Sequence, residues 1–231
     1  MIVISRRNEI AKNWQAVQSS VAAACKSAER NFAEIEIIAV TKTWPASDVD
    51  LLAELGVNNV GENRDQEASI KHSQVVATTL KWHAIGQIQT NKVKSIAQWA
   101  DVVHSIDRPE LVEAFAKALR ESSKKLDVFI QLNLDEQEAE HRGGAMASEL
   151  KAMASKILEV PNLNLIGVMG VAPLAGDAAA AFGKLQQASK ELQVLLPTAH
   201  YISAGMSLDY EIALKYGATH LRIGSAILGS R

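Results

Sequence analysis

Eight short apolar runs recur along the chain, and each is followed by a stretch with helical periodicity. The runs are dense in Ile, Val and Leu and show no clean alternation of polar and apolar residues. This pattern is typical of strands that are buried on both faces, as in parallel sheets. We therefore expect strands at residues 36–42, 58–61, 81–86, 101–105, 127–133, 164–169, 200–203 and 220–224.

The segments between these runs carry helix signals. Gly56 and Gly217 stand where the C-terminus of a helix needs a left-handed residue, and Ser47 stands where a helix N-cap is expected. A leading helix, at about residues 5–30, precedes the first strand. The other helical stretches are residues 47–56, the segment after the second strand, and residues 90–100, 109–122, 148–160, 178–196 and 208–217.

Repeated strand–helix units of this kind predict a parallel (β/α)8 TIM barrel. We expect residues 1–231 to form a single α/β domain, a TIM barrel with an extra N-terminal helix. The alternative is a doubly wound open sheet. However, no Gly-rich dinucleotide loop follows the first strand, which counts against the Rossmann arrangement.

Composition limits the partners of the chain. The formal net charge is -2, so no overall positive field attracts nucleic acid or an anionic membrane surface. The apolar stretches are far shorter than the ~20 residues of a membrane span. Cys25 is the only cysteine, which excludes an internal disulfide and suits a reducing cytosol. We expect a cytoplasmic monomer that binds neither nucleic acid nor membranes.

In such a barrel, functional residues follow the carboxyl ends of the strands. Lys42 closes the first expected strand. An ammonium at the end of a buried strand loses hydration, which favours the neutral amine as a nucleophile toward aldehydes. Two plainer interpretations remain: the side chain extends to solvent at the rim, or it pairs with a carboxylate such as Glu62.

The last two expected strands end in segments rich in serine and glycine, at residues 203–207 and 222–225. Such segments also form ordinary tight turns. In a barrel, however, the corresponding loops commonly hold phosphate through turn N–H groups and hydroxyls. An aldehyde-reactive lysine across from a phosphate site suggests pyridoxal 5'-phosphate (PLP) held as a Schiff base. Arg222 would then face the pyridine nitrogen and keep it unprotonated.

Four separated motifs, VTKTWP, GENRDQE, WHAIGQIQTNK and SAGMSLDYEIALKYGATHLRIGSAILG, resemble those of the pyridoxal phosphate homeostasis proteins. The resemblance covers about residues 4–229. This family is similar to the barrel domain of bacterial-type alanine racemase without its second domain. The resemblance implies that Lys42 carries PLP and that Arg222 lies at the ring nitrogen. By the same resemblance, the residues around the phosphate are Ser203, Gly205, Ser207, Gly224 and Ser225, and those lining the rest of the pocket are Asn63, His83 and Met206.

The chain departs from the family pattern at several positions. The family has methionine where Ala204 stands and threonine where Ser225 stands. Ser225 keeps a hydroxyl, so we expect phosphate binding to survive, whereas Ala204 loosens the pocket. His141 and Arg142 stand near a position where lysine is common, so no role of that lysine is carried over.

Several other residues have plain structural interpretations. For His83, a structural role in the strand is as good an expectation as a cofactor contact. Cys25 is expected to be buried and inert, and the spacing of the histidines shows no metal-binding motif. Met146, Met153 and Met169 are expected in the core.

Catalysis has a stricter requirement than binding. Racemisation needs an acid or base on each face of the ring, and Lys42 serves only one face. The chain has three tyrosines, of which Tyr201 falls in a strand and Tyr210 and Tyr216 on one helix. We therefore expect no catalytic residue and no enzyme, but a carrier in PLP homeostasis that delivers PLP to PLP-dependent apo-enzymes. The alternatives are a weak PLP-dependent amino-acid racemase and a Schiff-base aldolase that uses Lys42.

Overall fold

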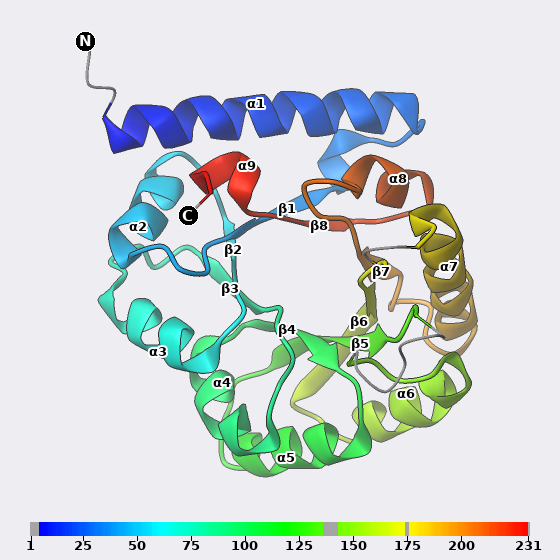
Figure 1. Cartoon of the computed structure of the whole chain (residues 1–231). Coiled ribbons are helices and arrows are strands. Elements are labelled where there is room, and N and C mark those ends of the chain that lie inside the picture. Colours follow the sequence, from blue (N-terminus) through cyan, green and yellow to red (C-terminus); the bar gives the residue numbers. More distant parts are fainter. Residues whose placement is uncertain (1–4, 136–142, 174–175, 231) are drawn as a thin grey trace.

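Eight parallel strands form a closed barrel in the computed structural model, which describes residues 5–135, 143–173 and 176–230 (Figure 1). The strands pair in sequence order, and β8 closes the barrel on β1 with Arg222 opposite Ile38. The predicted TIM barrel is confirmed, and the open sheet is wrong. The strands are β1 (Glu36–Val40), β2 (Asn59–Glu62), β3 (Lys81–Ala84), β4 (Val102–Ile106), β5 (Leu126–Leu132), β6 (Leu163–Gly170), β7 (Tyr201–Ser203) and β8 (His220–Ile223).

Helices surround the barrel, as Figure 1 shows. Gly56 and Gly217 have φ values of 82° and 87°, which confirms their predicted left-handed positions at helix ends. The predicted N-cap at Ser47 is wrong, because α2 begins at Ala46 and the N-cap position is Pro45, two residues earlier. The helices are α1 (Arg6–Ser27), α2 (Ala46–Glu54), α3 (Asp65–Gln74), α4 (Val93–Trp99), α5 (Pro109–Leu119), α6 (Leu150–Leu158), α7 (Ala178–Leu195), α8 (Tyr210–Lys215) and α9 (Ser225–Leu228).

The leading helix α1 lies across the outside of α2, α9 and α8 (Figure 1). Ser5 caps it by accepting a hydrogen bond from the N–H of Asn8. Its inner face is apolar and includes the buried Cys25, as expected. On the same side of the molecule, Asn13 donates to the carbonyl oxygen of Ile227 in α9 at 3.0 Å.

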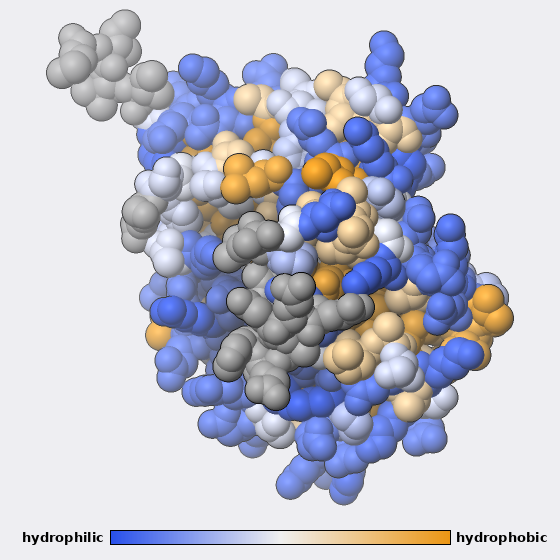
Figure 2. Space-filling view, turned by 45° about the vertical axis from the view of Figure 1, so that its right-hand side comes forward, coloured by the Kyte–Doolittle hydropathy of each residue, from blue (hydrophilic) through white to orange (hydrophobic). Residues whose placement is uncertain are grey.

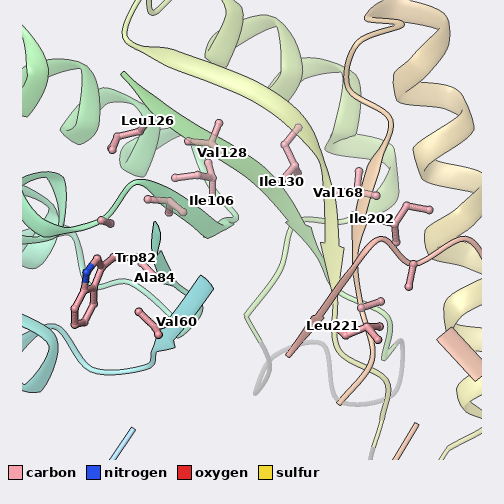
Figure 3. Packing of buried hydrophobic residues seen from close by; sticks show 14 of the residues in the cluster. Val60, Trp82, Ala84, Ile106, Leu126, Val128, Ile130, Val168, Ile202 and Leu221 are labelled. Atoms are coloured by element: carbon pink, nitrogen blue, oxygen red, sulfur yellow. The ribbon is translucent and has the colours of Figure 1, made fainter. Parts of the chain in front are cut away.

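Two apolar clusters stabilise the fold. The larger one fills the space between the strands and the helices, and Figure 3 shows members of it on β2 to β8. The smaller one consists of Val102, Phe129, Ile166 and Met169. Burying each large side chain contributes about 1.5–3 kcal/mol.

The methionines divide between core and surface. Met153 and Met169 are buried, as expected. Met146 is 45% exposed, so its predicted core position is wrong. It lies just before the short 3-10 helix Ala147–Glu149, and its backbone N–H donates a hydrogen bond to the Glu149 carboxylate.

Polar groups, unusually for a protein interior, also fill much of the barrel. His83, His104, His220 and Arg222 are all buried on its strands. On the outside, Figure 2 shows mostly hydrophilic side chains with smaller apolar areas between them. Across residues 5–135, 143–173 and 176–230, no helix has the length and apolar character needed to cross a membrane. His141 and Arg142, where the sequence departs from the family pattern, lie outside these residues.

Candidate functional site

The order of the strands brings Lys42 and the two segments rich in serine and glycine, residues 203–207 and 222–225, to one side of the rim. Strand β8 lies between β7 and β1, so the residues that follow these three strands are neighbours. Gly224, after β8, lies so close to the end of β1 that an added Cβ would be 3.3 Å from Val40 Cβ. Lys42 therefore lies in the loop beside the Gly224–Ser225 turn, at the carboxyl end of the barrel.

Lys42 is exposed, in a turn closed by a 3.1 Å hydrogen bond from Trp44 N–H to the Thr41 carbonyl oxygen. Thr43 has a φ of 68°, a conformation that costs a β-branched residue free energy. Its N–H donates to Glu67 of α3 at 2.5 Å. On the other side of Lys42, the Lys71 ammonium of α3 donates to the Thr41 carbonyl oxygen at 2.7 Å. Helix α3 therefore holds the backbone on both sides of Lys42.

Glu62, which the sequence offered as a partner for Lys42, pairs with Lys71 instead. Its Oε1 accepts hydrogen bonds from the Lys71 ammonium at 2.5 Å and from the Thr41 hydroxyl at 2.6 Å. Its Oε2 is buried and has no partner among the residues that the structure describes. Burial raises the pKa of Glu62, and the bonds from Lys71 and Thr41 oppose this change. The carboxyl group thus supports the turn of Lys42 rather than neutralising its amine.

The turn after β7 depends on glycine. Gly205 has a φ of 91°, and an added Cβ would lie 2.9 Å from both the Ala213 Cβ and the Tyr210 Cα. Its carbonyl oxygen accepts a 2.9 Å hydrogen bond from the N–H of Arg222, which fixes the turn against β8. Helix α8 begins at Tyr210 and not at Leu208, the expected start. The segment between them holds Met206, at 36% exposure, and the half-buried Ser207.

The turn after β8 is shorter. Helix α9 begins at Ser225 directly after Gly224, and the carbonyl oxygen of Gly224 accepts from the N–H groups of Ile227 and Leu228. The first N–H groups of a helix have no carbonyl one turn earlier to bond. Ser225 therefore offers both a hydroxyl and a backbone N–H beside the β1 end.

Arg222 and Ser203 lie deeper, inside the barrel. The Arg222 guanidinium donates to the Ser203 hydroxyl at 2.5 Å and to the Gly170 carbonyl oxygen at 3.0 Å. Burial lowers the pKa of Arg222 to about 10, so the group is still a cation at neutral pH. The Ser203 oxygen also lies 2.8 Å from Nδ1 of His104. The structure therefore brings Ser203 together with Arg222, below the segment that carries Ser207.

The two remaining predicted residues belong to neighbouring strands, one within β3 and one just after β2. His83 is buried in β3, and its ring nitrogens bond Asn59 and His104, so it occupies the barrel interior and not the rim. Asn63 follows β2, and its carbonyl and side-chain oxygens lie 2.1 and 2.5 Å from the position of a Cβ on Gly86. It thus packs against the loop after β3, beside a pocket of about 590 Å³.

A cavity of about 1310 Å³ lies at the amino end of the barrel and not at the rim of Lys42. Its lining includes His83, Tyr201 and His220. Among the described residues, no group of three or more His, Cys, Asp or Glu is placed to hold a metal ion. Sequence reasoning missed Lys71, Glu67 and His104, although Glu67 is the last residue of the GENRDQE motif that it singled out and Lys71 follows four residues later.

Comparisons with known proteins give consistent matches. The family model for the alanine racemase N-terminal domain matches residues 7–231. A pyridoxal phosphate homeostasis protein of Mycobacterium bovis is 38% identical, over 98% of this chain and 94% of the relative. The Escherichia coli protein of the same name is 34% identical, over 97% of both chains.

Solved structures are similar over the whole barrel. The structure of PipY from Synechococcus elongatus with PLP bound is 27% identical and has a TM-score of 0.82, over 95% of this chain and 100% of that chain. Alanine racemase of Corynebacterium glutamicum has a TM-score of 0.69 at 14% identity. The match covers 96% of this chain but only 60% of that racemase, so the likeness to the racemase is one of fold alone.

Proposed function

Since the chain belongs to the alanine racemase N-terminal-domain family, and within it to the pyridoxal phosphate homeostasis proteins, we propose that it binds PLP through Lys42 and acts as a PLP carrier. The observation that supports this most is the rim itself. An exposed lysine follows β1, and two turns that contain glycine and serine follow the adjoining strands β8 and β7. When bound, PLP supplies an aldehyde that condenses with the Lys42 amine, with loss of one water, to form a Schiff base.

The residues at the rim fit such a group. Gly224 leaves the space beside Val40 that a side chain would fill, and Gly205 allows a turn that a Cβ would obstruct. Ser207 and Ser225 would bind the phosphate through hydroxyl and turn N–H groups. Met206 would lie beside the cofactor, with the Asp209 carboxylate holding its N–H at 2.6 Å.

The ring nitrogen would face Arg222. The Ser203 hydroxyl and the Gly170 carbonyl oxygen accept hydrogen bonds from the two terminal nitrogens of Arg222. These bonds direct the guanidinium across the interior. An arginine offers only N–H donors, so it binds a ring nitrogen in its unprotonated form. Such a ring is a weak electron sink. Asn63 and His83 have weaker support as cofactor contacts, because Asn63 packs against Gly86 and both His83 nitrogens are bonded elsewhere.

The positions of the tyrosines support a carrier and not a racemase. Tyr201 begins β7 at the amino end of the barrel and packs against His200 and His220. Tyr216 lies near the position of a Cβ on Gly183 in α7, and the hydroxyl of Tyr210 interacts with Ser20 of α1. In the part of the chain that the structure describes, each tyrosine side chain thus has a place away from the Lys42 loop.

We further propose that the carrier acts in the cytoplasm and releases PLP to PLP-dependent apo-enzymes. The test is to titrate the dialysed protein with PLP while recording visible absorbance, and then to add an apo-enzyme and follow its activity. A saturable absorbance change and reactivation support the proposal. Exchange of the α-hydrogen of an added amino acid in deuterated water would instead indicate racemase chemistry.

A further inference from the structure

Six side chains form a hydrogen-bonded line through the barrel interior. The line begins near the carboxyl end and finishes at the amino end, and the central His104–Ser203 bond crosses the interior from β4 to β7. In order, its members are Arg222, Ser203, His104, His83, Asn59 and Glu36. The five donor–acceptor distances, in the same order, are 2.5, 2.8, 2.9, 3.0 and 2.6 Å.

Both histidines in the line are neutral at physiological pH. Burial lowers the pKa of His83 well below its ordinary value, and the neighbouring His220 and Lys81 lower it further. Burial also lowers the pKa of His104, with further contributions from the surrounding His83, His220 and Arg222. A neutral imidazole has one N–H donor and one acceptor nitrogen. Each ring therefore passes on the direction of hydrogen bonding that it receives.

Glu36 fixes that direction. Its carboxylate only accepts, so the Asn59 amide nitrogen must face it at 2.6 Å and the Asn59 oxygen must face His83. His83 then donates from Nε2 and accepts at Nδ1. His104 in turn donates from Nε2 to His83 and accepts at Nδ1 from the Ser203 hydroxyl.

The far end of the line agrees with this direction. Arg222 is only a donor, and it donates to the same Ser203 oxygen whose hydrogen is committed to His104. Ser203 therefore accepts from one side and donates to the other, and every bond in the line has a donor and an acceptor. Chains of this kind strengthen each bond by polarising the next.

We propose that Glu36, at the amino end of the barrel, sets the orientation of this line and so holds Arg222 for the cofactor ring. Asn59, His83 and His104 are then positioning residues that act on Arg222 through Ser203. Without the Glu36 carboxylate, the Asn59 amide can turn over, and every bond up to Ser203 can reverse. Ser203 would then accept from both His104 and Arg222, which weakens its hold on the guanidinium.

The end of the line at Glu36, at the amino end of the barrel, is open to solvent. Glu36, Asn59 and His83 all line the cavity of about 1310 Å³, so a charge or ligand placed there acts directly on the end that sets the direction. The consequence for PLP rests on the proposed function, whereas the direction of the line is a property of the protein alone. The two can therefore be tested separately.

The direction can be measured in the cofactor-free protein. Two-bond 1H–15N correlation spectra report which nitrogen of a neutral histidine carries hydrogen, and His72, on α3, serves as a reference outside the line. We expect His83 and His104 to be in the Nε2–H form in the wild type. Glu36→Leu should give a mixture of both forms, whereas Glu36→Gln, whose side-chain oxygen can still accept from Asn59, should keep the wild-type form.

Two results would overturn the proposal: an Nδ1–H form of either histidine in the wild type, or unchanged spectra in Glu36→Leu. The rate of PLP release provides the second readout. Glu36→Leu should release PLP about fivefold faster than the wild type, which corresponds to about 1 kcal/mol, and Glu36→Gln should not. Equal release rates would refute the positioning role. A wild type that binds no PLP would refute the proposed function and leave the spectral result standing.

Discussion

The buried ammonium of Lys71 donates a 2.7 Å hydrogen bond to the carbonyl oxygen of Thr41, the residue before Lys42. Lys71 is only 4% exposed, and it also bonds the carboxylates of Glu62 and Glu67. The loop of the proposed PLP lysine is therefore tied to α3 by a charged cluster. This relationship makes α3 part of the proposed site, although no side chain of α3 needs to touch PLP.

Lys71→Met should destabilise the protein, because it leaves Glu62 buried without its cation. Removing one partner of a buried pair costs about 3–5 kcal/mol. In the variant, the pKa of Glu62 lies even further above its value in the unfolded chain, so the folded state binds a proton more readily. The loss of stability should therefore be greatest at pH 8 and smaller at pH 5, which urea unfolding at both values measures.

Lys117→Met, on the surface helix α5, is the matched control, and it should change the free energy of unfolding little at either pH. The double variant Glu62→Gln/Lys71→Met should recover part of the loss, because it removes the uncompensated charge. A Lys71→Met protein as stable as the wild type at pH 8 would show that the cluster does not stabilise this loop.

The buried histidines should make the fold sensitive to acid. Burial lowers the pKa values of His83 and His104 well below 6.5 and that of His220 to about 3. The unfolded chain binds protons at these residues below about pH 6.5, while the folded chain does not. The free energy of unfolding should therefore fall as pH falls from about 6.5 towards 3, by up to about 1.4 kcal/mol per pH unit for each histidine.

Urea unfolding across this range would measure the slope. Replacing His220 with Phe should reduce it, since one buried group no longer titrates. Replacing the exposed His200 with Gln is the control and should leave the slope unchanged. A wild-type stability that does not vary between pH 6.5 and 4 would disagree with three neutral histidines in the interior.

Gly205→Ala should reduce stability more than Gly56→Ala, although both glycines have φ near 90°. The positive φ costs an alanine about 1–2 kcal/mol at either position. At Gly205, the new Cβ would also lie 2.9 Å from Ala213 Cβ, whereas Gly56 has nothing within 4 Å of the added atom. Overpacking adds about 1–3 kcal/mol. Equal losses in thermal or urea unfolding would mean that the turn after β7 adjusts without strain.

Ser203 and Ser207 should affect PLP binding differently. Ser207→Ala should weaken the binding of PLP but not of pyridoxal, which has no phosphate. Ser203→Ala should weaken both ligands, because the Ser203 hydroxyl bonds Arg222 and His104 inside the barrel. Calorimetric titration of each variant with the two ligands measures the difference. Identical ligand profiles for the two variants would contradict the separate roles.

The sequence alone predicts the barrel and the shared rim, because both follow from the order of strand–helix units. Once β8 lies between β7 and β1, the segments of Lys42, Gly205 and Gly224 meet at one end. The supporting contacts are harder to predict, because they depend on side-chain packing between distant segments. Lys71 and Thr41 are 30 positions apart, and His104 and Ser203 are 99 apart. Sequence patterning gives no indication that these particular pairs face each other.

The depth of a residue in the barrel is likewise set by packing. Ser203 and Ser207 belong to one sequence motif, and the family resemblance predicts both at the phosphate. The hydroxyl of Ser203, the last residue of β7, bonds Arg222 and His104 inside the barrel, whereas Ser207 lies in the turn beyond the strand. His83 is similar: its position in β3 was evident from the sequence, but its two hydrogen-bond partners on β2 and β4 were not.

The identity of the lysine that PLP modifies tests the central claim most directly. The purified protein is incubated with PLP, reduced with borohydride and digested, and the modified peptide is identified by mass spectrometry. We predict one dominant adduct on Lys42, lost in Lys42→Ala and retained in Lys117→Ala. A dominant adduct on another lysine, or an unchanged yield of adduct in Lys42→Ala, would contradict the account.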